Sequence, residues 1–308
     1  MGRSGRSKPS GGKASWPLLF LISIVGSVKK HAHATHDEPS HQEEAEEVNS
    51  MDNFIDRYQH GAHQQVWDEL YALGSEIRSG SLYTEALAVA HETMRRVRVN
   101  IELLIPRLQA LGYEFGYESL RATHPHDAYL AEWIAKQPAR YSPASEETTR
   151  QIAQFEHETG LLPLSLRAFY REVGNVNFVG RHPQWNRFFQ LSPRAYGFDP
   201  LMVVDFSEAT VEFPYWKEAY AGAEDAPPEP LYIAPDYMMK YYVSGSGGYE
   251  MEFPNAAIDG RLLHEWHNTT FVNYLRICLR YGGIPGLESI EHFIEEELAY
   301  LRKDLLPI

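Results

Sequence analysis

The sequence predicts an α+β fold: a mixed, largely antiparallel sheet flanked by helices, with a helical hairpin towards the N-terminus. Two observations lead to this class. Apolar residues recur every three or four positions in the first third of the chain and again near its end, as amphipathic helices require. Between these regions, from residue 201, short apolar runs alternate with glycine- and proline-containing turns, which is typical of strands joined by hairpins.

Composition excludes several classes of protein. The chain has 308 residues, 13% of them aromatic, and a net charge of −14. No stripe of Lys and Arg is visible, which argues against nucleic-acid binding. Residues 141–308 carry 24 acidic and 13 basic side chains, so an acidic face there either attracts a basic protein partner or serves solubility alone. The single cysteine, Cys278, excludes an internal disulfide and a Cys-based zinc site, and fits a reducing compartment.

Residues 1–50 differ from the rest and allow three interpretations. Basic residues precede an apolar run at 16–28, and Ala32 and Ala34 follow at the spacing of a cleavage site, which is the layout of a signal peptide. The run is short for a membrane span, so a membrane anchor is the weaker alternative. If translation starts at Met51, the segment is a disordered upstream extension. We expect a cytoplasmic protein without a stable membrane span, or a secreted or anchored one if residues 1–34 act as a signal.

Residues 51–140 are expected to form a helical N-terminal region. Helices over 52–73 and 80–111 are joined by "GSEIRSGS" as an antiparallel hairpin, and Pro106 should kink or restart the second. A short strand is expected within 112–120. A short helix over 126–138 is expected to stop at Pro138.

The following segment carries the clearest helix signals. Ser145 is a candidate cap, acidic residues occupy the first turn, and Gly160 ends the helix. Pro163 fits the first turn of a second helix, which Gly174 closes before a short strand "FVG" at 178–180. One side of that helix is apolar and should be buried: Leu162, Leu166, Phe169, Tyr170 and Val173.

Strand signals dominate from residue 201. Apolar runs at 201–206 and 230–235 predict buried strands. Hairpins are expected over 238–254, around a glycine turn, and over 256–266, with Asp259-Gly260 as the tight turn. A helix capped at Thr269 or Thr270 and ended by Gly282 follows, and an acidic helix over 288–305 closes the chain.

No catalytic, metal or cofactor motif is visible. "HEWH" at 264–267 lacks the spacing of a zinc protease, and "SGSGG" at 244–248 lacks the pattern of a nucleotide-binding loop. Glu250 and Glu252 share one face of a strand, where paired carboxylates could act as acid and base, but no nucleophile or metal partner accompanies them. We therefore expect no catalytic residue, no metal and no cofactor.

Aromatic and acidic residues of the C-terminal region are the candidates for partner binding. His182 and Trp185, next to the glycine turn, are either structural or part of a binding rim, because Trp and Arg are favoured anchors of interfaces. The full set of candidate partner-binding residues is His182, Trp185, Tyr237, Tyr241, Tyr249, Glu250 and Glu252.

The order of these motifs resembles the SUKH superfamily, which includes the yeast Smi–Knr cell-wall regulators. The resemblance covers roughly residues 142–288, and residues 271–288 are similar to the closing segment of long bacterial members. The resemblance implies an α+β domain over 141–308 built on a mixed sheet, and binding rather than catalysis: many bacterial members are immunity proteins that neutralise toxins, often nucleases or deaminases. It rests on "LMVVDF", the hairpins and these residues: Leu162, Pro163, Leu166, Phe169, Tyr170, Gly174, Gly180 and Trp185.

Two functions of different classes remain open. The first is a non-enzymatic protein-binding module, in toxin immunity or regulation, whose partner is a protein such as a basic toxin domain. The alternative is a hydrolase or transferase with an unrecognised site. A cleft with facing titratable groups favours the enzyme, whereas a broad aromatic and acidic surface favours the binding module.

Overall fold

The computed structural model describes residues 53–117, 125–136, 141–191, 198–221, 229–242 and 247–308. All of them belong to one compact unit, and the expected boundary between residues 140 and 141 lies inside it. The segment 1–50, with its three interpretations, Pro138 and the turn at 244–246 lie outside the described residues.

From residue 53 to residue 110 the structure describes four helices: α2 (Phe54–Gln59), α3 (His63–Ala72), the 3₁₀ helix η1 (Gly74–Arg78) and α4 (Gly80–Ala110). The prediction of one helix over 52–73 is wrong. Gly61 adopts a φ of 104°, which ends α2 and lets α3 start in a new direction. The long α4 confirms the second helix, and it continues through Pro106 instead of restarting there.

The next pair of helices follows the sequence signals closely. In α7 (Glu146–Thr159) the Ser145 hydroxyl accepts a hydrogen bond from the Thr148 N–H at 3.1 Å, and Gly160 ends the helix with a φ of 126°. The predicted apolar side of α8 (Leu164–Glu172) is confirmed, since all five of its residues are buried. This side packs in the main core, and α8 also lies against α4.

The strands form three small antiparallel sheets in the part of the chain that the structure describes, which confirms the α+β class. β1 pairs with β4, β3 lies between β2 and β5, and β7 lies between β6 and β8. The Val204 N–H donates to the Ile233 carbonyl at 3.0 Å and so joins the second sheet to the third. The strands are β1 (Glu114–Phe115), β2 (Tyr141–Ser142), β3 (Asn175–Asn177), β4 (Gly180–Arg181), β5 (Met202–Val203), β6 (Leu231–Pro235), β7 (Gly248–Met251) and β8 (Leu262–Leu263).

Two predicted hairpins are wrong. Residues 239–241 form the 3₁₀ helix η2 (Met239–Tyr241), so the partner of β7 is β6 rather than the segment just before the glycine turn. Asp259 is not at a surface turn: it is 2% exposed, and its carboxylate accepts hydrogen bonds from the Val272 N–H and the Ser165 hydroxyl. Asp259 therefore caps the following helix from a distance, whereas the predicted cap Thr270 makes no side-chain capping bond.

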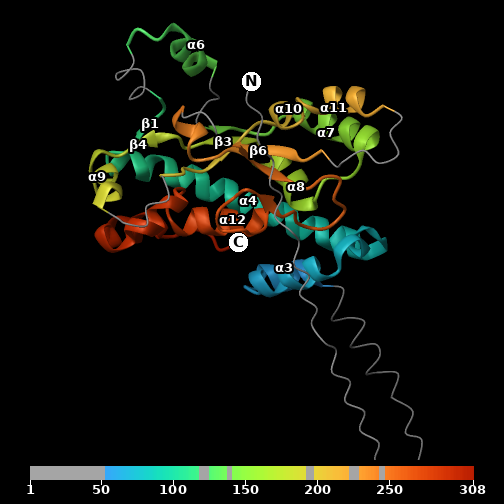
Figure 1. The fold of residues 1–308 in the computed structure, drawn as a ribbon. Helices are drawn as coiled ribbons and strands as arrows, with labels where there is room; N and C mark the ends of the chain where they lie inside the picture. The colour runs from blue at the N-terminus through green and yellow to red at the C-terminus, as the bar shows by residue number, and fades with distance from the viewer. Residues whose placement is uncertain (1–52, 118–124, 137–140, 192–197, 222–228, 243–246) are drawn as a thin grey trace, which may run out of the picture. The chain divides into compact units, whose positions relative to one another are not determined.

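The remaining helices enclose the strands. Figure 1 shows β3 and β6 between a layer containing α4, α8 and α12 and a group formed by α7, α10 and α11. The acidic helix expected over 288–305 divides at Ile294 into η3 and α13. The elements not yet given are α6 (Ala128–Lys136), α9 (Pro183–Leu191), α10 (Phe206–Ala209), α11 (Phe213–Ala219), α12 (Phe271–Arg280), η3 (Pro285–Phe293) and α13 (Glu295–Arg302).

Residues 303–308, called the strap below, follow α13 and are tied to α4. The side-chain amide of the buried Asn100 donates to the Leu306 carbonyl and accepts from the Leu306 N–H, both at 2.8 Å. Arg96 donates to the Pro307 carbonyl at 3.0 Å. Polar groups of the helix thus fix an extended segment that makes no helix or strand of its own.

Candidate partner-binding surface

Two of the candidate residues, His182 and Trp185, are parts of the core. Trp185 is 0% exposed and His182 is 6% exposed. The ring Nδ1 of His182 accepts from the Trp185 N–H at 3.2 Å, so Nε2 carries the proton and donates to the Leu111 carbonyl at 2.8 Å. His182 therefore caps α9 and joins it to the end of α4. These two side chains do not form a binding rim, because both are buried.

Tyr249 lies in a buried ionic network. Its hydroxyl donates to Asp199 Oδ2 at 3.1 Å, and Lys240 Nζ donates to Asp199 Oδ1 at 2.5 Å. The side chains of Lys240 and Asp199 are 0% and 2% exposed. Burial and the charge of Asp199 raise the pKa of Tyr249, so this phenol stays protonated. The network is structural: it connects η2, β7 and the residue before Pro200, and it leaves no side chain for a partner.

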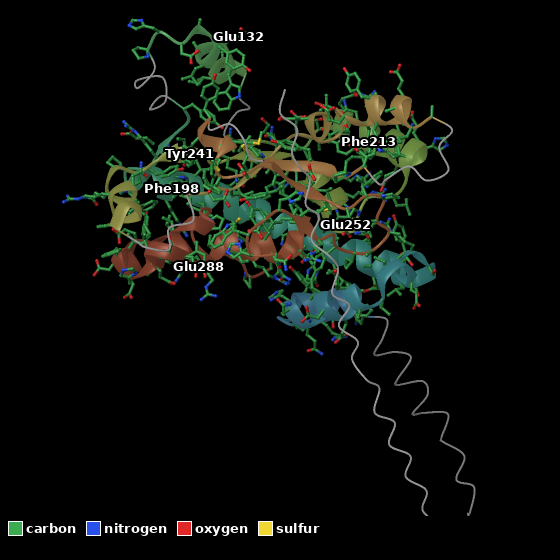
Figure 2. All side chains as sticks on the ribbon, in the orientation of Figure 1. Glu132, Phe198, Phe213, Tyr241, Glu252 and Glu288 are labelled. Carbon is green, nitrogen blue, oxygen red and sulfur yellow. The ribbon has the colours of Figure 1, made fainter. Side chains whose placement is uncertain are left out.

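Tyr241 is also engaged inside the fold. Its hydroxyl donates to the Gly180 carbonyl at 3.0 Å, and burial raises the pKa of Tyr241 well above its ordinary value. Figure 2 labels both Tyr241 and the candidate Glu252. The three remaining candidates do reach the surface: Glu252 is exposed, Glu250 is half-buried and Tyr237 is 40% exposed.

Glu250 belongs to the outer side of the β6–β7–β8 sheet. Alternate residues of β6 and β7 face the core, and between them Tyr232 and Glu250 are partly exposed and directly opposite each other in the strand register. The Tyr232 ring lies across Gly248, where an added Cβ would come within 2.1 Å of it. A side chain at position 248 would therefore displace this ring.

Carboxylates gather around Tyr232. Burial, followed by the charges of Glu208, Asp236 and Glu250, raises the pKa of the Tyr232 phenol. Glu208 comes from α10, which packs against β6. We call the group made by Glu208, Glu212, Glu229, Tyr232 and Glu250 the acidic face. These residues come from four segments of the chain, so the fold, rather than a run of sequence, brings their charges together.

The carboxylates of the acidic face repel one another. Burial and the charge of Asp205 raise the pKa of Glu208, and burial with the charges of Glu250 and Glu212 raises that of Glu229. Among the described residues, Glu208, Glu212 and Glu229 form no ion pair, while Glu250 has the exposed His264 with Nε2 at 3.5 Å. Unpaired like charges at one place cost stability, which is typical of a surface that serves binding.

Aromatic side chains lie beside the acidic face. The charge of Glu208 also contributes to the raised pKa of Tyr117, after the larger effect of burial. The Tyr117 ring contacts the Trp133 ring edge-on at 4.7 Å between centroids, and Trp133 contacts Tyr242 at 5.2 Å. Tyr129, on α6 with Trp133, is 70% exposed. We call Tyr117, Tyr129, Trp133 and Tyr242 the aromatic cluster.

The "HEWH" residues separate into two contacts rather than one site. His264 faces Glu250, whereas His267 lies between two carboxylates, with Nδ1 at 2.5 Å from Glu265 and Nε2 at 3.2 Å from Glu288. Burial alone would lower the pKa of His267, but the hydrogen bonds and charges of Glu265 and Glu288 outweigh it and raise this pKa. With both ring nitrogens bound to carboxylates, the imidazole has no free nitrogen for general-base chemistry.

The described residues contain no group of three or more His, Cys, Asp or Glu arranged to hold a metal ion. Within the same residues no helix is both long and apolar enough to cross a bilayer. Comparisons of the chain with protein-family models, curated proteins and solved structures found no match.

Sequence reasoning missed most of this surface. Of the candidates it proposed, only Glu250 belongs to the acidic face, while Tyr237 and Glu252 are surface residues outside it. Glu208 looked like part of a connection after a strand, and Tyr232 like one residue of a buried run. The available signal was a side chain with a polar group, Tyr232 or Glu250, between apolar neighbours in the strand. This pattern is typical of a strand with one side exposed to solvent.

Proposed function

We propose that the chain is a non-enzymatic binding protein whose acidic face and aromatic cluster together bind a basic protein. The observation that carries the proposal is the gathering of carboxylates around Tyr232, next to the aromatic cluster. Three of these carboxylates, Glu208, Glu212 and Glu229, form no ion pair among the described residues. A cationic partner relieves the repulsion among these carboxylates. The rings add the tight contacts that form once water is excluded.

The resemblance to the SUKH superfamily supports a more specific partner. A toxin domain that acts on nucleic acid has a positively charged substrate groove, and an acidic protein that covers such a groove blocks it. An immunity or regulatory role in the cytoplasm is the function that fits both the resemblance and the acidic face. The hydrolase or transferase alternative has less support, because His267, which lies between two carboxylates, has both ring nitrogens occupied.

The experiment uses two steps. A partner is first captured from the native cell with the chain from Met51, and its binding is then measured by surface kinetics at two salt concentrations. Wild type is compared with Glu208→Gln/Glu250→Gln and with Glu76→Gln/Glu295→Gln, which removes the same charge from exposed positions outside the acidic face.

Association of the wild type should slow strongly as salt rises, because the Debye length shortens to about 8 Å near 0.15 M. The Glu208→Gln/Glu250→Gln variant should associate more slowly than the control variant, since on-rates report electrostatic steering. Equal association rates for the two variants, or an association rate that ignores salt, would refute binding at the acidic face.

A further inference from the structure

A second feature, separate from the acidic face, is a groove between α12, the end of α13 and the strap. Its volume is about 290 Å³, close to the lower end of the range of roughly 300–1,000 Å³ that is usual for small-molecule sites. Three arginines and several aliphatic side chains line it, among them Arg276, Arg280, Arg302, Leu279, Leu305 and Ile308. None of the described residues that line it is acidic. A basic, apolar groove is unusual in a chain with a net charge of −14.

The arginines are held in place but not fully neutralised. Arg280 and Arg302 lie over the Tyr281 ring, with their guanidinium carbons 5.6 and 5.5 Å from its centroid. Arg302 pairs with Glu291 at 3.0 Å, while the exposed Arg280 forms no ion pair among the described residues. Stacking on an aromatic ring fixes a guanidinium without using its N–H donors. Arg280 therefore keeps donors available for an anion.

Arg276 lines the groove and is tied to the strap. Its Nε donates to the Ile308 backbone oxygen at 2.9 Å and its Nη1 to Asn273 Oδ1 at 2.8 Å. It is partly buried, and burial lowers the pKa of its guanidinium. A partly buried positive charge adds attraction for an anion in the groove, since its field is less screened than in open solvent.

The walls suit an aliphatic chain better than a peptide. The lining side chains other than the arginines are leucines, a proline and an isoleucine, which offer contact but no hydrogen bonds. The strap carbonyls of Leu306, Pro307 and Ile308 already accept from Asn100, Arg96 and Arg276. A peptide would bring N–H groups that need acceptors, whereas an alkyl chain needs none.

We propose that this groove binds a free aliphatic acid of medium chain length, with the carboxylate at Arg280 and the chain along Leu279 and Leu305. Arginine donors match a carboxylate geometrically, and the aliphatic walls take the chain out of water. The proposal stands apart from the protein-binding function and needs no protein partner for its test.

The test is calorimetric titration of the full chain with octanoate, decanoate and dodecanoate, each below the concentration at which it forms micelles. Affinity should rise about fourfold for each added methylene until the groove is filled. Decylamine and 1-decanol are the matched ligands without the negative charge, and both should bind at least about tenfold more weakly than decanoate. Equal affinity for decanoate and decanol, or no dependence on chain length, would overturn the proposal.

A pair of variants tests the place of binding. Arg280→Gln should weaken decanoate binding about tenfold or more, because it removes the available guanidinium. Arg150→Gln, at an exposed arginine of α7 outside the groove, should leave the affinity unchanged. Both positions are exposed, so neither change threatens the fold. If Arg280→Gln binds decanoate as tightly as the wild type, the site is not here.

Discussion

At the scale of single residues, large and charged side chains hold the core together through partners that lie far away in the chain. Nothing in the sequence near Trp185 distinguishes an interface anchor from a core residue, because Trp185 is buried beside the ring of Tyr113, 72 residues earlier. The ion pair between Asp199 and Lys240 could not be predicted from the sequence either, since the two residues are 41 positions apart. Contacts between distant segments decided which candidate was exposed.

The buried pair gives the first prediction. Lys240→Met should lower the free energy of unfolding by about 3–5 kcal/mol, because the buried Asp199 would lose its cationic partner and keep only the hydrogen bond from the Tyr249 hydroxyl. Chemical unfolding in urea measures the loss. The double variant Lys240→Met/Asp199→Leu should recover much of it, since both charges are then absent. A single variant that loses less than about 1 kcal/mol would contradict this account.

His267 gives a prediction about pH. Its pKa in the folded state is raised above the value of about 6.5 expected when unfolded, so its stabilising effect is fully present below that value and is lost as pH rises through the folded-state pKa. The free energy of unfolding of wild type should therefore exceed that of His267→Gln most at acidic pH and least at alkaline pH.

Unfolding curves recorded between pH 5.5 and 8.5 check this difference. His264→Gln is the matched control, because its side chain is 65% exposed and a surface pair contributes little. A difference between wild type and His267→Gln that stays constant over the pH range would show that the two carboxylates do not act through the charge of His267.

At the scale of elements, the features that depend on neighbouring residues could be predicted from the sequence. Those that depend on distant residues could not. The cap at Ser145, the stop at Gly160 and the buried side of α8 depend on neighbouring residues, and each is confirmed. The predictions of strands and hairpins were wrong where contacts with distant residues determine the local structure. Asp259-Gly260 reads as a tight turn, yet Asp259 binds Ser165, 94 residues earlier, and the start of α12. Gly61 is the sequence signal that indicates the break in the helix predicted over 52–73.

The turn after α8 supports a prediction about glycine. Gly174 has a φ of 94°, and an added Cβ would lie 2.2 Å from the Ser142 carbonyl of β2. Gly61 has a similar φ of 104°, but no atom lies within 4 Å of an added Cβ. Gly61→Ala should cost about 1–2 kcal/mol for the backbone conformation alone, and Gly174→Ala about 1–3 kcal/mol more for the clash.

Urea unfolding of both variants measures this difference directly, because the two changes are chemically identical. Equal decreases in the free energy of unfolding for Gly61→Ala and Gly174→Ala would mean that β2 shifts away from position 174 at no cost. Its pairing with β3 would then contribute little to stability.

At the scale of the whole molecule, the helical N-terminal region and the strand-containing region form one unit. α4 contacts α8 extensively and also reaches α13, so the two regions share a core. The expectation of an α+β domain over 141–308 came from the resemblance to the SUKH superfamily, which begins near residue 142. A resemblance that covers part of a chain does not by itself mark the boundary of a folded unit.

This shared core predicts cooperative unfolding. A chain from Met51 to Ile308 should fold alone and melt in one transition, with the same midpoint by far-UV circular dichroism and by tryptophan fluorescence. A fragment of residues 141–308 should not fold, because the buried side of α8 would lose α4. Two separate melting transitions, or a fragment that melts like the longer chain, would show that the regions are independent.

The strap has a consequence for how the protein is made. Asn100 is in the first half of the chain, and its two backbone partners belong to Leu306, 206 residues later. During synthesis α4 leaves the ribosome long before the strap exists, so the Asn100 amide can be buried only at a cost of about 1–3 kcal/mol or must stay in water. The helical layer therefore stays open while the strands are still being translated. It closes only when residues 303–308 have emerged, so the native packing around Asn100 forms after the strands have been translated.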